Sequence, residues 1–231
     1  MKISVCMATY NGEKYIENQL ESILTQISSN DEIIISDDGS NDRTLEIIEK
    51  IKKNTNKKII VINGPQKGVI KNFENAILKS SNDIIFLSDQ DDIWSKTKVE
   101  EVKKIFSINE DITLVIHDAK LINENGEIIG KKSKFKKGLI KNIIKNSYIG
   151  CCMSFKKSKY ILPFPKNIPM HDSWIGLINE KKGKVYYLEK ELFCYRIHGE
   201  NYTLKNQRSL KNKIEDRINL IRNVLLRGEK W

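Results

Sequence analysis

The sequence is poor in cysteine and proline, and it contains no long apolar run. Four of the 231 residues are cysteine and four are proline. No two cysteines have the Cys-x-x-Cys spacing of zinc or thioredoxin-like redox sites, so the sequence gives such sites no support. No stretch approaches the ~18 apolar residues that span a bilayer. The apolar stretch 3–8 is too short for a signal peptide, and it predicts a first strand and a cytoplasmic protein.

The composition is that of a globular protein with a basic charge balance. Hydrophobic residues make up 39% and charged residues 30% of the chain, which is long enough to bury a substantial core. The formal net charge is +10. This balance favours nucleic acid, anionic lipid or phosphorylated ligands as partners without distinguishing between them.

Residues 1–118 alternate short apolar runs with amphipathic stretches. The apolar runs predict strands near Lys2–Ala8, Glu32–Asp37, Lys58–Asn63, Ile84–Ser88 and Thr113–His117. Apolar residues at helical spacing predict helices over Tyr15–Gln26 and Thr44–Ile51, around Phe73–Leu78 and around Val99–Phe106. Such alternation predicts an α/β fold with a Rossmann-like, mainly parallel sheet flanked by helices.

The pattern changes after residue 118. Asn125-Gly126 between apolar pairs predicts a β-hairpin. A basic segment (131–145), an apolar run (148–155), a proline-containing loop and a helix beginning near His171 follow. Two further strands are expected at Val185–Leu188 and Leu192–Ile197. We expect one domain over 1–206, with a nucleotide-binding half (1–118) and a more variable half (119–206), and a C-terminal helical extension over 207–231.

The C-terminal stretch 208–227 has an apolar stripe beside basic residues. The stripe consists of Leu210, Ile214, Ile218, Ile221 and Leu225. Two interpretations stay open: a membrane-surface helix attracted to anionic lipid, or an ordinary helix packed on the domain or on a second copy in a homodimer.

The most informative stretch is Phe-Leu-Ser-Asp-Gln-Asp-Asp-Ile-Trp at 86–94. Asp89, Asp91 and Asp92 follow directly on the expected strand 84–88, and ligands of open α/β sheets bind at this end of the strands. Three like charges so close together need a compensating cation or hydrogen-bond donors. Hard divalent cations often join carboxylates to substrate phosphates, so the stretch predicts an Mn²⁺ or Mg²⁺ site for a phosphorylated substrate. The alternative is a solvated acidic turn that caps the next helix.

Other polar groups follow the remaining strands. Ala8-Thr9-Tyr10-Asn11-Gly12-Glu13 ends the first strand, and Ser36-Asp37-Asp38-Gly39-Ser40 ends the second. Asp38 is not required as a helix cap, and its carboxylate could accept a hydrogen bond from a pyrimidine base. Asp172 at an expected helix start could be a cap or a general base. His198 at a strand end could complete a metal site, and Arg196 beside it could meet a phosphate.

These motifs, in this order, resemble family 2 glycosyltransferases of the GT-A fold. The segments Ser-Asp-Gln-Asp-Asp-Ile-Trp at 88–94 and Tyr-Arg-Ile-His-Gly-Glu-Asn at 195–201 resemble those of the bacterial rhamnosyltransferase-like branch. The resemblance covers roughly residues 1–203. It implies a metal-dependent, inverting transfer of a sugar from a nucleoside-diphosphate sugar, such as dTDP-rhamnose or a UDP-hexose.

The resemblance also implies a role for each matching residue. The donor would be held by Ala8, Tyr10, Glu13, Asp38, Lys67 and Asp89, with Asp89 on the ribose. Asp91 would hold Mn²⁺ or Mg²⁺, with His198 as a further ligand. Asp172 falls where the family places its catalytic base. The acceptor would meet His171, Trp94 and Trp174, although either tryptophan could equally be a core residue.

The chain departs from the family pattern at two places. Phe73-Glu74 stand where the family usually has Arg-Asn, so the cation that contacts the diphosphate is not identified, with Lys67 and Lys71 nearby. His171-Asp172 stand where the family usually has Glu-Asp, which implies a local effect on the pKa of the base.

The resemblance implies an acceptor hydroxyl on a lipid-linked glycan precursor of the cell surface. The expected location is therefore the cytoplasm, with peripheral binding to the inner face of the membrane. Three other functions stay open. A sugar nucleotidyltransferase would have a glycine-rich, basic loop after its first strand, where this chain has one glycine and one lysine. A nucleic-acid-binding module would interleave aromatic and basic residues, which this chain does not. The third is a non-catalytic transferase-like subunit.

Overall fold

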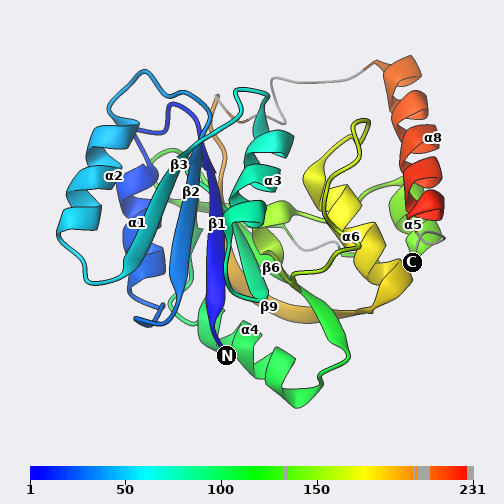
Figure 1. Ribbon diagram of the computed structural model, residues 1–231, viewed down its shortest axis with the longest axis horizontal. Helices are drawn as coiled ribbons and strands as arrows, with labels where there is room; N and C mark the ends of the chain where they lie inside the picture. Colours follow the sequence, from blue (N-terminus) through cyan, green and yellow to red (C-terminus); the bar gives the residue numbers. More distant parts are fainter. Residues whose placement is uncertain (133–134, 200, 202–208, 228–231) are drawn as a thin grey trace.

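The computed structural model describes residues 1–132, 135–199, 201 and 209–227, which form a single nine-stranded sheet covered by helices (Figure 1). The domain boundary expected at 206–207 lies outside the described residues. In chain order the elements are β1 (Ile3–Thr9), α1 (Ile16–Leu24), β2 (Glu32–Asp37), α2 (Thr44–Lys53), β3 (Lys58–Asn63), α3 (Val69–Lys79), β4 (Ile84–Asp89), β5 (Ile93–Trp94), α4 (Lys98–Ile108), β6 (Ile112–Ile122), β7 (Ile128–Lys132), α5 (Leu139–Ile144), a 3₁₀ turn (Gly150–Cys152), β8 (Met153–Lys156), α6 (His171–Lys182), β9 (Lys184–Arg196) and α8 (Leu210–Leu226).

The first four strands form the parallel part of the sheet, in the order β3-β2-β1-β4. β1 and β2 are buried along their whole length, as strands covered on both faces must be. Their apolar side chains pack against the buried faces of α1, α2 and α3. The expected α/β architecture with a mainly parallel first half is therefore confirmed.

The second half of the sheet mixes strand directions. β8 pairs antiparallel with both β4 and β6, and β6 pairs parallel with β9. The expected hairpin is confirmed, since β6 pairs antiparallel with β7 and Gly126 has a φ of 86°. The 3₁₀ turn before β8 lies against the end of β4. This turn thereby carries residues of the second half to the ligand edge of the first.

One expectation for this half was wrong, and one short strand of the sheet was missed. The expected pair of strands, 185–188 and 192–197, is one strand, β9. Its pairing with β6 shifts register near His117/Asp118, so a bulge replaces the turn between them. The short strand β5 was missed because it lies inside the acidic stretch. It pairs with β9 through Ile93–Cys194 and Trp94–Phe193.

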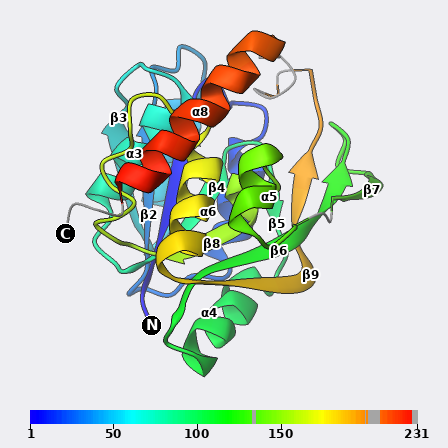
Figure 2. The same cartoon turned by 90° about the vertical axis from the view of Figure 1, so that its right-hand side faces the viewer.

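α8 lies at the edge of the molecule, against α5 and α6 (Figures 1 and 2). The helix expected in this stretch is present, but its apolar stripe does not pack on the domain. Leu220 and Val224 are buried instead, whereas the five stripe residues are exposed. Among the described residues, no helix is long and apolar enough to cross a bilayer.

Candidate active site

The parallel strands bring the donor-side residues to one edge of the sheet. In the register, Ala8 of β1 lies beside Asp89 of β4 on one side and beside Ser36 of β2 on the other. Asp37 of β2 lies beside Thr9 of β1, and Asp38 comes next, so both lie at this edge of the sheet. The chain turns in opposite directions after β1 and β4, and such a switch point is where open α/β sheets bind ligands.

Gln90 ties the loop after β4 to the loop after β1. Its side-chain oxygen accepts a hydrogen bond from Tyr10 N at 2.9 Å, and its nitrogen donates to Tyr10 O at 2.9 Å. Gly12 permits this approach, because a Cβ there would lie 2.3 Å from the Gln90 oxygen. The bridge fixes the backbone of Tyr10 while its ring stays exposed, so the ring is available to a ligand.

Asp38 organises the loop after β3. One of its carboxylate oxygens accepts from Gln66 N at 2.7 Å and the other from Gly68 N at 2.8 Å. Lys67 lies between these two residues and is exposed. The two predicted donor residues therefore belong to one hydrogen-bonded unit, and Asp38 positions the loop that carries Lys67.

Glu13 and Asp37 also hold backbone. Glu13 accepts from Arg43 N at 3.0 Å, just before α2. Asp37 accepts hydrogen bonds from Gly39 N, from Ser40 N and, at 2.9 Å, from the Thr9 hydroxyl. Asp37 therefore stabilises the turn after β2. The resemblance implies that Glu13 contacts the nucleoside, but in the structure its carboxylate accepts from the backbone of Arg43.

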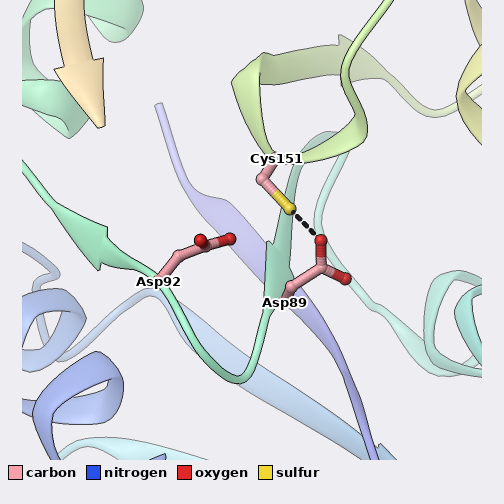
Figure 3. Close-up of side chains that lie close together, drawn as sticks. All are labelled: Asp89, Asp92 and Cys151. Carbon is pink, nitrogen blue, oxygen red and sulfur yellow. Dashed lines mark hydrogen bonds between the residues drawn. The ribbon is translucent and has the colours of Figure 1, made fainter. Parts of the chain in front are cut away.

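Asp89 and Asp92 lie close together, and Asp89 points toward Cys151 (Figure 3). The Cys151 thiol donates to Asp89 Oδ2 at 2.6 Å. Burial, followed by the charge of Asp91, raises the pKa of Asp89 to about 7. The same two causes raise the pKa of Asp92 well above its usual range. One oxygen of Asp92 accepts from Arg196 N, while the other is buried without a hydrogen-bond partner among the described residues.

A buried lysine lies below this cluster. Lys98 Nζ donates to the backbone oxygen of Cys151 at 2.6 Å and lies 4.2 Å from the centre of the Trp94 ring. Burial lowers its pKa to about 8. Lys98 places a positive charge near Asp89 and Asp92, but its hydrogen bond goes to a carbonyl, so it offsets their negative charge only in part.

Asp91 pairs with His198, and these are the two residues that the resemblance implies as metal ligands. His198 Nε2 lies 2.8 Å from Asp91 Oδ2. Arg196 lies beside the pair, with its Nε donating to Asp91 O at 2.8 Å and its Nη1 to Glu124 O at 2.8 Å. The buried Arg196 guanidinium therefore donates to backbone carbonyls, which argues against the phosphate contact considered for it.

The donor set around Asp91 fits a divalent cation. Carboxylate oxygen and imidazole nitrogen are suitable ligands for Mn²⁺. One buried oxygen of Asp92 has no hydrogen-bond partner among the described residues, so it can accept a further ligand beside Asp91. Asp89, Asp92 and Cys151 form a second acidic group, with ligand atoms within 4.8 Å of one another. Its thiol is a poor ligand for Mg²⁺ or Mn²⁺, because burial raises the pKa of Cys151 well above its usual range.

Asp172 occupies the first turn of α6, where the helix begins at His171. Its Oδ1 accepts from Asn146 Nδ2 at 3.4 Å and from the Ser173 hydroxyl at 3.2 Å. Burial raises the pKa of Asp172 to about 6, against the opposing effects of Ser173 and Lys132. A carboxylate with a pKa in this range is a stronger base than an ordinary aspartate and is still ionised at neutral pH.

The two departures from the family pattern face each other. The rings of Phe73 and His171 are stacked, with centroids 4.2 Å apart and an angle of 30° between them. Both His171 nitrogens are buried without a hydrogen-bond partner among the described residues. Burial lowers the pKa of His171 to about 3, so the ring is neutral. His171 is thus packed behind Asp172 and offers an acceptor little surface.

Both tryptophans expected at the acceptor site are core residues in the structure. Trp174 has no exposed surface, and its Nε1 donates to Ile161 O at 2.8 Å. Trp94 is 3% exposed and packs against Phe86 and Lys98. Neither ring has a free face for a sugar, which agrees with the alternative that they are core.

Sequence reasoning missed three groups that the structure brings to the site. Lys132 Nζ lies 4.3 Å from the centre of the Tyr195 ring, and its charge lowers the pKa values of both Asp89 and Asp172. Cys151 and Asn146 contact Asp89 and Asp172, respectively. The only signal for these groups was position: Lys132 lies in the basic segment, and Cys151 lies in the apolar run.

Comparisons with known proteins agree with this geometry. The family model Glycosyl transferase family 2 matches residues 4–161. A dTDP-rhamnosyl transferase of Shigella flexneri, RfbG, is 31% identical, over 96% of this chain and 81% of its own length. An uncharacterised glycosyltransferase of Nostoc is 27% identical, over 87% of this chain and 66% of its own length. This chain therefore spans just under two thirds of the Nostoc relative.

Solved structures share the fold. TarS from Staphylococcus aureus, in complex with UDP-GlcNAc, superposes with a TM-score of 0.73, at 20% identity, over 98% of this chain and 66% of that one. A mannosyltransferase from Pyrobaculum calidifontis, in complex with GDP-Man and Mn²⁺, has a TM-score of 0.63 at 12% identity, over 97% of this chain and 73% of that one. The GT-A architecture is thereby shown, and the match of the family model to more than half of the chain establishes that this protein belongs to glycosyl transferase family 2.

Proposed function

We propose that the protein is an inverting glycosyltransferase that moves a sugar from a nucleoside-diphosphate sugar to an acceptor hydroxyl. One observation carries the proposal: the turn Gly150–Cys152 touches both sides of the site. Cys151 Sγ donates to Asp89 Oδ2 at 2.6 Å, and a Cβ at Gly150 would lie 2.7 Å from Nε2 of His171, the neighbour of Asp172. A candidate base and the candidate donor carboxylates therefore share one site. Membership of the family favours this function over the nucleotidyltransferase and nucleic-acid-binding alternatives.

In this mechanism each group of the chain has a distinct task. The Tyr10 ring and the loop held by Asp38 contact the nucleoside, and Asp89 binds the ribose. Asp172 takes the proton from the acceptor hydroxyl. The oxygen then attacks the anomeric carbon from the face opposite the diphosphate, and the bond between that carbon and the diphosphate oxygen breaks.

The departing diphosphate carries the bonding electron pair and needs positive charge nearby. Asp91 and His198 would hold Mn²⁺ or Mg²⁺, which supplies this stabilisation when bound. The positive charge of Lys132 lowers the pKa values of both Asp89 and Asp172, so Lys132 is near both sides of the site. We assign it the cation role that the missing family arginine left open.

The relatives suggest the class of substrates. RfbG is a dTDP-rhamnosyl transferase, and WfgD of Escherichia coli, 25% identical over 97% of this chain, transfers glucose from UDP-Glc to a diphosphoundecaprenol-linked sugar. We therefore propose a dTDP- or UDP-sugar donor and a lipid-linked glycan precursor of a cell-surface polysaccharide as acceptor. The reaction would then take place on the cytoplasmic side of the membrane.

Metal-dependent nucleotide binding tests the proposal. UDP, dTDP and GDP should each be tried by calorimetry with Mn²⁺ and with a chelator. At least one should bind with Mn²⁺ and lose most of its affinity with the chelator. Asp91→Ala should abolish the Mn²⁺-dependent part while leaving the fold intact, because removing one of three neighbouring negative charges relieves repulsion.

The matched control is Asp83→Ala. Asp83 is an exposed aspartate at the opposite end of β4. This variant should bind nucleotide like the parent chain. Equal affinity with Mn²⁺ and with chelator, or an unchanged Asp91→Ala variant, would remove the metal from the proposal.

A further inference from the structure

α8 presents large apolar side chains to solvent. Leu210 is 75% exposed, Ile218 60% and Leu225 58%. The helix nevertheless has a buried side, since Leu220 and Val224 pack on the domain. A shallow hollow of about 340 Å³ lies on α8, lined by Ile218, Ile221, Arg222, Leu225 and Leu226. Contiguous exposed apolar surface of this kind marks an interaction site.

The neighbouring helix α5 also exposes apolar side chains. Ile140 and Ile144 are each 72% exposed. α5 contacts α8, and both helices lie on the side of the molecule that faces the viewer in Figure 2. We call the exposed apolar residues of these two helices the α5/α8 face: Ile140, Ile144, Leu210, Ile214, Ile218, Ile221, Leu225 and Leu226.

The charges around this face are mainly positive. Two acidic residues, Glu215 and Asp216, lie on α8. The basic residues on and next to the two helices include Lys136, Lys137, Lys141, Lys145, Lys211, Lys213, Arg217, Arg222 and Arg227. Apolar side chains with basic flanks are the composition of helices that lie in the interface of an anionic membrane.

We propose that the α5/α8 face binds the surface of an anionic lipid bilayer, with its apolar side chains inserted among the headgroups. The basic flanks contact lipid phosphates, and attraction to the negative surface brings the protein to the bilayer. The binding stands on exposure and charge. Its use in catalysis rests on the proposed function.

The face is joined to the candidate base by a short path. Asn142 of α5 accepts the Ser147 hydroxyl at 2.6 Å. Asn146, the residue before Ser147, donates to Oδ1 of Asp172 in α6. α5 is further tied to α6 through Gly138 N, which donates to Glu180 at 2.9 Å. A bilayer against α5 would therefore present a lipid-linked acceptor on the Asp172 side of the site.

A second copy of the chain fits this face less well. In a two-fold dimer the same patch meets itself. Two α5/α8 faces in contact would bring two sets of lysine and arginine side chains together with few carboxylates to balance them. Such like-charge contact opposes association, whereas lipid phosphates complement it.

Flotation with vesicles tests the proposal. The chain should float with phosphatidylcholine vesicles that contain phosphatidylglycerol at low salt, and much less with phosphatidylcholine alone or at high salt. The double variant Ile144→Gln/Ile218→Gln should lower the partition coefficient at least ~10-fold, because burying even one isoleucine side chain in the bilayer favours the bound state about 10-fold. Ile108→Gln is the matched control, because Ile108 is 69% exposed at the end of α4, outside the face. It should float like the parent chain.

Light scattering and nucleotide binding separate the remaining outcomes. If the parent chain does not float at low salt, or if the double variant floats equally well, the proposal is overturned. A dimer that the double variant abolishes would assign the face to a second copy and also overturn it. Mn²⁺-dependent nucleotide binding should be unchanged in the double variant. Flotation without nucleotide binding in the parent chain would retain the membrane face and reject the proposed function.

Discussion

The donor side and the base side of the site are assembled in different ways. On the donor side, Ala8, Asp38 and Asp89 lie at the ends of parallel strands, and the strand register alone brings them to one edge. On the base side, Asp172 lies at a helix start and is contacted by Asn146 from an irregular segment. Position in a strand determines the first group, whereas packing between distant segments determines the second.

The difference is also electrostatic. The donor side gathers Asp89, Asp91 and Asp92 within four residues and leaves one buried oxygen of Asp92 without a hydrogen-bond partner in the part of the chain that the structure describes. The base side holds the single carboxylate of Asp172 beside the neutral ring of His171. The donor side is therefore suited to a cation, and the base side to the transfer of one proton. Variants of the two sides should then change different measured quantities.

The largest effect is expected for Asp172→Asn. The substitution keeps the size of the side chain but removes its basicity, so the transfer rate should fall by at least ~10². Affinity for the donor nucleotide should stay close to that of the parent chain, because Asp172 lies on the base side. Steady-state kinetics together with calorimetry measure both quantities. A fully active Asn variant would break the comparison by removing the base from this side.

The pH dependence gives the matching control. The base must be ionised to accept a proton, and burial raises the pKa of Asp172 to about 6. The rate of the parent chain should therefore rise as the pH increases through about 6 and then level off. The residual activity of Asp172→Asn should lack this step.

A smaller effect is expected for Lys132→Met. The Lys132 charge favours the ionised forms of Asp89 and Asp172, so its loss should raise the pKa of both groups. The acid limb of the pH–rate profile should move to higher pH, and kcat/KM should fall about 10-fold, the effect of roughly one charge-assisted hydrogen bond. Lys132→Arg should retain most of the activity.

Lys131→Met is the control for this prediction. Lys131 precedes Lys132 on β7 and points to the other face of the strand. It should leave the profile unchanged. If both methionine variants behave alike, Lys132 contributes only to the general positive charge of this segment, and it does not join the two sides.

Predictability from the sequence follows the same division. Apart from the short strand β5, the strands and helices up to residue 108 and the clustering of their ends could be predicted, because apolar periodicity and parallel register are local or near-local properties. Asp91 and His198 were also assigned to one site. The sequence could not reveal that Cys151 lies against Asp89, or that Lys132 reaches both carboxylates. Those contacts depend on the mixed strand order around β8 and on the bulged pairing of β6 with β9.

Exposure was the other property that the sequence could not supply. The amphipathic pattern of 208–227 correctly predicted a helix, but the apolar stripe is exposed while Leu220 and Val224 are buried. For the same reason, the sequence could not decide whether Trp94 and Trp174 stack on a sugar or pack in the core. A pattern identifies which residues share a side of a helix, and only tertiary packing decides whether that side meets the domain or solvent.

The smallest effect concerns the packing behind the base. Phe73 and His171 replace the charged residues that the family usually has at these positions, and their stacked rings imply that the two replacements depend on each other. A double-mutant cycle with Phe73→Leu, His171→Leu and the double variant should give a coupling of about 0.5–1.5 kcal/mol in the free energy of unfolding. His171→Leu alone should cost less than Phe73→Leu, because leucine removes two buried nitrogens that have no partner among the described residues. Chemical denaturation measures each term, and additive losses would show that the two positions are independent.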